Sequence, residues 1–103
     1  MAATCQLCIW DSTVILGVSG DLDVEGAPAP DLAVPDGIRQ VVVDARRLRF
    51  VDSSGLRTFV TLHGKVAVRI VTAEDSGLRR LLNLTGIDTV IDVYGSVDEA
   101  LAG

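Results

Sequence analysis

The sequence contains few of the residues that build metal, redox or catalytic sites. Its 103 residues include one histidine and two cysteines, and only 4% are aromatic. Cys5 and Cys8 form a single C-x-x-C pair, and with His63 they are too few for a closed zinc site. In an extended segment the two thiols would point to opposite faces. We therefore interpret both cysteines as packing residues and expect no metal and no cofactor.

Long apolar runs and basic clusters are also missing. No apolar run approaches the roughly 20 residues that a membrane span requires, and no basic segment with an apolar stretch behind it marks a secretory signal. The formal net charge is -5, and the nine lysines and arginines form no long basic run. This balance argues against direct nucleic-acid binding. We expect a cytoplasmic protein without membrane insertion.

The composition is typical of one folded domain. Apolar residues make up 49% of the chain and charged residues 22%, which is a normal globular balance. A chain of this length is expected to form a single domain over residues 1–103 and to bury one core.

Strand patterns alternate with helix patterns, which predicts an α/β fold with a largely parallel sheet. Strands are predicted over residues 3–10, 13–19, 38–45, 66–71 and 88–94. Helices are predicted over residues 53–63, from a cap at Asp75 or Ser76 to Gly86, and from Ser96 to Ala102. All three prolines fall between positions 28 and 35, where we expect a loop with one short turn at 30–34.

Two arginine-containing segments are interpreted as solvated. The unbroken Val41-Val42-Val43 run predicts a central strand buried on both faces, and the basic segment 46–49 after it is interpreted as a loop. Arg79 and Arg80 are interpreted as the exposed face of their helix.

The stretch FVDSSGL, residues 50–56, joins a predicted strand to a predicted helix. Asp52 or Ser53 would supply the N-cap, and Gly55 would permit close backbone approach. The stretch also lies at the carboxyl end of a strand, where sites gather in open α/β sheets. A serine phosphorylated in the first helical turn would meet free N–H groups and add about -1.5 to -2 charges beside Asp52. The cap and the phosphorylation site both remain open on these grounds.

Hydrolytic catalysis by these serines is not expected. The only histidine, His63, lies at the far end of the same predicted helix. The sequence has neither a G-x-S-x-G elbow nor a phosphate-binding P-loop motif. A small enzyme built on the Asp52-Ser53-Ser54 loop is thus the weakest reading, and we expect that the chain is not an enzyme.

Three segments in the right order resemble the STAS domain family of bacterial anti-sigma factor antagonists. VVVDARRLRFVDSSGLRTF, 41–59, contains the family's D-S-S-G-L motif. VSGDLD, 18–23, is similar to its G-E-L-D segment, with Asp21 where glutamate is commoner, and 78–101 resemble its closing helix, strand and helix. The resemblance implies a single STAS-like domain with a mixed, largely parallel sheet of about five strands and short helices packed mainly on one side. The proline-broken 27–37 and the short Gly64-Lys65 connection are trimmed relative to the family.

The resemblance implies a phosphorylation-controlled partner switch. The cognate anti-sigma factor, a serine kinase of the histidine-kinase-like ATPase fold, would be bound when Ser54 is unphosphorylated and released when it is phosphorylated. A PP2C-type phosphatase would reset the switch. Ser54 is the phosphoacceptor by position, and the partner-binding residues are Asp21, Asp23, Asp52, Ser53, Gly55, Leu56 and Arg57.

STAS domains also serve as scaffolds, which gives an alternative function. The chain would then be an unphosphorylated subunit of a lipid-transport ATPase complex or a larger signalling assembly. In that case the DSSG stretch would be an interface turn.

Overall fold

The computed structural model describes residues 4–22 and 36–103, with the backbone alone at residues 4–7, 21, 22, 50 and 54. The α/β class predicted from the sequence is confirmed. The expected short turn at 30–34 lies outside the described residues. The elements in chain order are β1 (Thr4–Trp10), β2 (Thr13–Leu22), β3 (Gln40–Val51), α1 (Ser53–His63), β4 (Ala67–Val71), α2 (Gly77–Thr85), the 3-10 helix η1 (Ile87–Thr89), β5 (Asp92–Tyr94) and α3 (Val97–Ala102).

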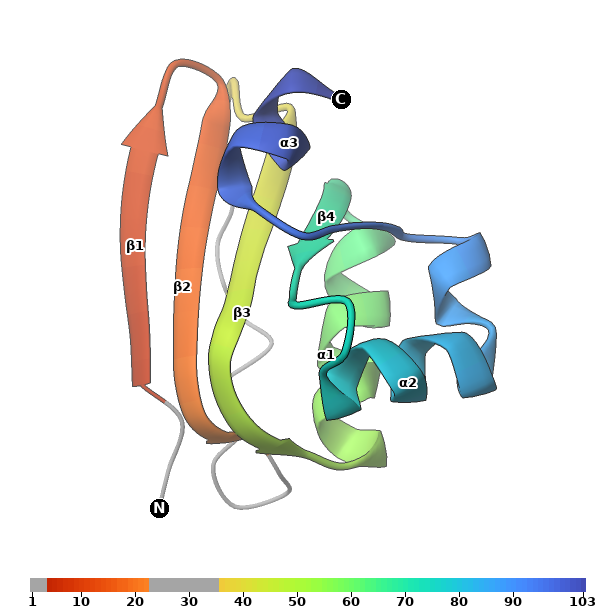
Figure 1. The fold of residues 1–103 in the computed structure, drawn as a ribbon. Helices are drawn as coiled ribbons and strands as arrows, with labels where there is room; N and C mark the ends of the chain where they lie inside the picture. The colour runs from red at the N-terminus through yellow and green to blue at the C-terminus, as the bar shows by residue number, and fades with distance from the viewer. Residues whose placement is uncertain (1–3, 23–35) are drawn as a thin grey trace.

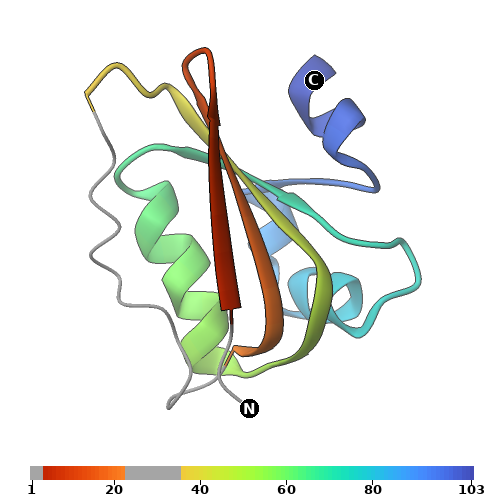
Figure 2. The ribbon, with the colours of Figure 1, turned by 90° about the vertical axis from the view of Figure 1, so that its left-hand side faces the viewer.

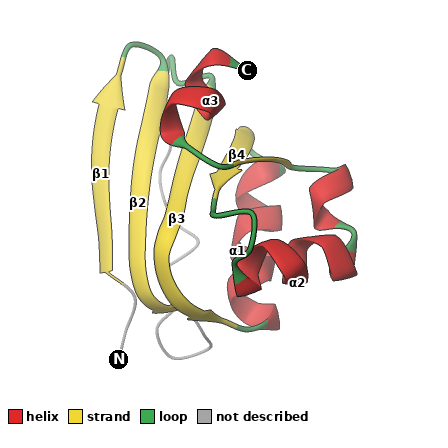
Figure 3. Ribbon diagram, in the orientation of Figure 1, coloured by secondary structure: helices red, strands yellow, loops and turns green. Residues whose placement is uncertain are grey.

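The five strands form one sheet in the order β1-β2-β3-β4-β5. β1 runs antiparallel to β2, and every other neighbouring pair is parallel. Figures 1 and 3 show this sheet with β1 at one edge and β3 in the middle. The sheet is therefore mixed and largely parallel, as expected.

Helices cover both faces of the sheet, with the larger core on one of them. Figure 2 views the sheet from its β1 edge and shows α1 and α3 on opposite sides. Val41 and Val43 of β3 pack in the main core with α1 and α2, whereas Val42 packs under α3. Val42 and Val43 are fully buried and Val41 nearly so. This confirms a central strand buried on both faces.

The last helix is tied to the sheet by its caps and by one arginine. The Ser96 hydroxyl accepts a hydrogen bond from the Glu99 N–H at 3.1 Å, which confirms the predicted N-cap. Arg69 Nη1 donates to the Ala100 and Gly103 carbonyls at 2.5 and 2.6 Å. Ala100 is fully buried against the sheet. Arg69 thus satisfies carbonyls that a helix end leaves without partners.

Two predictions of local structure were wrong. The strand expected over 88–94 is only Asp92–Tyr94, because the left-handed cap at Gly86 (φ 77°) turns the chain into η1. That turn brings Ile91 into the core, where it is fully buried. The segment 46–49, expected as a loop, belongs to β3, because β2 pairs with β3 as far as Val51.

The interpretation of two side chains, Cys8 and Arg79, also needs correction. Cys8 is a free, exposed thiol, because β1 is an edge strand that α3 does not cover. The side chain of Cys5 is not described. Arg79 is only partly exposed and its Nη1 atom is buried, so of the two helix arginines only Arg80 lies on the exposed face.

Candidate functional site

Asp52 caps the helix that carries the two serines. Its Oδ1 accepts a hydrogen bond from the Gly55 N–H at 3.0 Å, and its carbonyl accepts one from the Leu56 N–H at 3.0 Å. These are the bonds of an N-cap residue, which confirms Asp52 as the cap. Ser53 and Ser54 therefore begin the first turn of α1, and the Ser53 side chain is exposed.

The alternation of buried and exposed positions fixes how α1 presents its first turn. Leu56 and Phe59 are buried in the main core, and Gly55 is buried as well. Arg57 is exposed. Burial of the apolar stripe thus holds the helix against the sheet and leaves Ser53 and Arg57 accessible to another protein.

The sheet register brings the second predicted loop to the same edge. Asp21 pairs with Phe50, and Leu22 pairs with Val51, immediately before the Asp52 cap. The carboxyl ends of the parallel strands β2 and β3 therefore lie side by side. In open α/β sheets, ligands bind outside the carboxyl ends of the strands. The backbone of Asp21 therefore lies beside the part of β3 that leads into the DSSG turn. Asp23 lies outside the described residues.

The only histidine of the sequence lies away from the DSSG turn. His63 lies at the opposite end of α1, and its Nδ1 accepts the Val68 N–H at 3.1 Å. That hydrogen bond links α1 to β4, so it gives His63 a structural role. Within residues 4–22 and 36–103, no group of three or more metal-ligating side chains lies close enough to hold an ion.

Strand β3 carries an ion pair between Asp44 and Arg46, which precede the DSSG turn in the sequence. Arg46 donates from Nε and Nη2 to the two carboxylate oxygens of Asp44, both at 2.8 Å. These hydrogen bonds hold the pKa of Asp44 below its usual value, and the same carboxylate raises the pKa of Arg46. This bidentate pair fixes the Arg46 guanidinium beside the strand. The sequence interpretation missed it because it placed Arg46 in a loop.

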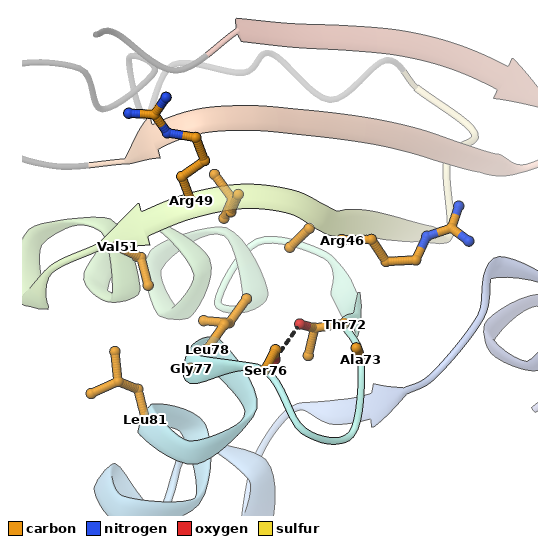
Figure 4. Close-up of a pocket in the computed structure, with 11 residues that line it drawn as sticks. Arg46, Arg49, Val51, Thr72, Ala73, Ser76, Gly77, Leu78 and Leu81 are labelled. Atoms are coloured by element: carbon orange, nitrogen blue, oxygen red, sulfur yellow. Dashed lines mark hydrogen bonds between the residues drawn. The ribbon is translucent and has the colours of Figure 1, made fainter.

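A hollow of about 360 Å³ lies between the end of β3 and the start of α2. We call it the β3–α2 groove. Figure 4 shows Val51 on β3 facing Leu78 and Leu81 on α2, while the guanidinium groups of Arg46 and Arg49 point away. No motif marks this groove, since its two walls are distant in the sequence. The groove forms where β3 continues to Val51, beyond the last residue that pairs with β4, Asp44.

Removing the Asp52 cap should cost measurable stability. We expect Asp52→Ala to lower the free energy of unfolding by about 1 kcal/mol, because the Gly55 N–H loses its acceptor. Urea denaturation of the purified chain measures this difference. Ser53→Ala is the matched control in the same turn, and as an exposed residue it should change stability by less than about 0.5 kcal/mol. Equal stability of Asp52→Ala and the wild type would contradict the cap.

Comparison with known proteins agrees with this architecture. The STAS domain family model matches residues 8–100. The anti-sigma-F factor antagonist RsfB of Mycobacterium tuberculosis is 26% identical over 100 residues, which cover 90% of this chain and 82% of RsfB. The crystal structure of an anti-sigma factor antagonist from Mycobacterium paratuberculosis superposes with a TM-score of 0.86 at 27% identity, covering 98% of this chain and 92% of that one.

A more distant structure shares the fold. The phosphorylated form of the Bacillus cell fate determinant SpoIIAA has a TM-score of 0.56 at 21% identity, covering 96% of this chain and 97% of that one. The class of fold is α/β, with a mixed β-sheet and a helix, α1, that begins at the Asp-Ser-Ser-Gly turn. The chain belongs to the STAS domain family, which confirms the resemblance seen in the sequence. Among the described helices, none is long and apolar enough to cross a membrane.

Proposed function

We propose that this STAS domain is an anti-sigma factor antagonist, a binding module rather than an enzyme, controlled by phosphorylation of Ser54. The observation that carries the proposal is the edge where the ends of β2 and β3 meet and α1 opens on Asp52-Ser53-Ser54. The names of the relatives RsfB and the M. paratuberculosis protein support the same role.

The position of Ser54 suits a reversible switch. It is the second residue of α1, and a helix N-terminus stabilises an anion there by about 0.3–1 kcal/mol. A phosphate would thus be tolerated by the fold. It would also add about -1.5 to -2 charges to a surface that already contains Asp52. A partner docked on this turn would be repelled while the domain stayed folded.

The partners in this proposal are a kinase and a phosphatase. The unphosphorylated chain binds an anti-sigma factor serine kinase of the histidine-kinase-like ATPase fold, and a PP2C-type phosphatase removes the phosphate. The docking surface consists of the DSSG turn and the β2 end, and its residues are Asp21, Asp23, Asp52, Ser53, Gly55, Leu56 and Arg57. This role requires the chain to act in the cytoplasm, where sigma factors bind RNA polymerase.

A tagged pull-down from the native host tests the proposal. We expect the wild-type chain to recover an anti-sigma factor kinase, and mass spectrometry to find phosphate on a fraction of Ser54. Thr61→Ala, at an exposed position near the other end of α1, is the control and should retain the phosphate, whereas Ser54→Ala should lose it. Recovery of transporter subunits with wholly unmodified Ser54 would replace the switch with a scaffold role.

A further inference from the structure

Arg57 is an exposed arginine close to the start of α1. Within residues 4–22 and 36–103, no hydrogen bond or ion pair holds its guanidinium. Arg46 on β3 differs, because both carboxylate oxygens of Asp44 hold its guanidinium at 2.8 Å. A guanidinium has five N–H donors and binds carboxylate or phosphate oxygens through two of them at once. Arg57 can therefore take up a new acceptor without breaking a bond to the described part of the chain.

Position 54 lies on the accessible side of α1, next to Arg57. With 3.6 residues per turn, helix positions seven apart are almost in line. Thr61, seven positions after Ser54, is exposed, whereas Phe59 on the opposite side is buried in the main core. Residues three positions apart are neighbours on a helix surface, with Cβ atoms about 5–6 Å apart. A group added to Ser54 would therefore stand beside the Arg57 side chain.

The other charged side chains near this turn are already in use. Asp52 Oδ1 accepts the Gly55 N–H at 3.0 Å. Asp52 is also five positions from Arg57, a spacing that does not make two residues neighbours on a helix. Arg49, on the strand before the turn, has an interaction of its own. Arg57 is the single lysine or arginine of α1, so it is the cation that the helix itself offers to an anion at position 54.

A phosphate on Ser54 has the chemistry that a guanidinium binds best. It adds three strong acceptor oxygens and about -1.5 to -2 charges at pH 7. Hydrogen bonds between a guanidinium and phosphate oxygens are charge-assisted and are often formed in pairs. Repulsion from the nearby Asp52 carboxylate gives the phosphate a further need for a cation. These conditions favour a pair between the phosphate and Arg57 on the surface of α1.

We propose that phosphorylation of Ser54 captures Arg57, whose guanidinium donates hydrogen bonds to the phosphate oxygens and is held on the surface of α1. This inference rests on the proposed function, because it concerns how modification of that same site releases the partner. In the unphosphorylated chain, Arg57 is available to a carboxylate of the anti-sigma factor. Phosphorylation then acts twice: it adds negative charge to the turn, and it withdraws the single arginine of α1 from the interface.

Genetically encoded phosphoserine at position 54 of the full chain tests the capture without a kinase or a partner. The second pKa of the phosphate is measured by 31P NMR titration. We expect Arg57→Gln to raise this pKa by about 0.5, because the guanidinium favours the dianion. Arg80→Gln removes an exposed arginine from α2 and, as the matched control, should leave the pKa unchanged. Equal pKa values with and without Arg57 would overturn the capture.

Side-chain spectra of the arginines distinguish a hydrogen-bonded pair from a general effect of charge. We expect the Arg57 Nε–H resonance to shift when position 54 carries phosphate, and its exchange with water to slow about tenfold. The Arg80 resonance should stay in place. Arg57→Lys keeps the charge but lacks the planar two-point donor geometry, so it should restore only part of the pKa difference. An Arg57 resonance that is the same with and without phosphate would contradict the pair.

The recovered anti-sigma factor separates this inference from the proposed function. We expect Arg57→Gln to weaken its binding about tenfold in the unphosphorylated chain, but less than about twofold when position 54 carries phosphoserine. If the loss is equal in both states while phosphoserine still blocks binding, the capture of Arg57 is wrong and the switch stands. If the 31P difference is found but no anti-sigma factor is recovered, the partner assignment is wrong and the proposed function fails.

Discussion

Replacing Ser54 by aspartate is expected to weaken binding of the anti-sigma factor about a hundredfold. A like charge placed in a protein interface costs several kcal/mol, and each 1.4 kcal/mol, roughly, corresponds to a tenfold change in affinity. The new carboxylate would stand in the first turn of α1, two positions after Asp52. Titration calorimetry of the purified variant with the anti-sigma factor measures the change.

Two further variants distinguish a switch from a general loss of fold. Ser54→Ala should bind like the unphosphorylated wild type and should not be released by ATP. Thr61→Asp adds the same charge to an exposed position at the other end of α1 and should leave affinity unchanged. Matching thermal unfolding of all variants would show that the domain is intact. Wild-type affinity of Ser54→Asp would be decisive against a charge-controlled switch.

Leu82→Ala is expected to be the most destabilising of the substitutions discussed. Leu82 on α2 is fully buried in the main core, against the sheet face that α1 also covers. Truncation of a buried leucine costs about 2–5 kcal/mol, and a domain of this size has about 5–15 kcal/mol in total. Urea denaturation should show a large fall in the transition midpoint.

Leu84 provides the matched control on the same helix. Its side chain is 73% exposed, so Leu84→Ala removes the same atoms without opening a cavity. The free energy of unfolding should change by less than about 0.5 kcal/mol. Because both changes are from leucine to alanine, helix propensity cancels in the comparison. Equal losses at the two positions would mean that α2 does not pack as described.

The sequence predicted those elements whose ends are marked by local chemistry. α1 and the two later helices have capping side chains at Asp52, Ser76 and Ser96, and the hydrogen bonds that these make are local. Gly86 likewise ends α2 through its own left-handed backbone. The central strand was predictable because the Val41–Val43 run has no polar position for solvent.

Features that depend on distant segments were not predicted. The tail of β3 is a strand because β2 pairs with it through two register shifts, and nothing within 46–49 records that pairing. Cys8 is exposed because of which strands α3 covers, and that depends on tertiary packing. The β3–α2 groove also depends on distant segments, because one of its walls is the tail of β3 and the other is α2. The DSSG turn itself was predictable, but its apolar neighbour was not.

The order of the strands in the sheet matches their order along the chain. Each strand can therefore pair with the strand made just before it during synthesis, and no strand has to be inserted between two that are already paired. Topologies with contacts between sequence neighbours close smaller loops and fold faster than those that bring distant segments together. The growing chain can thus build this sheet one strand at a time as it leaves the ribosome.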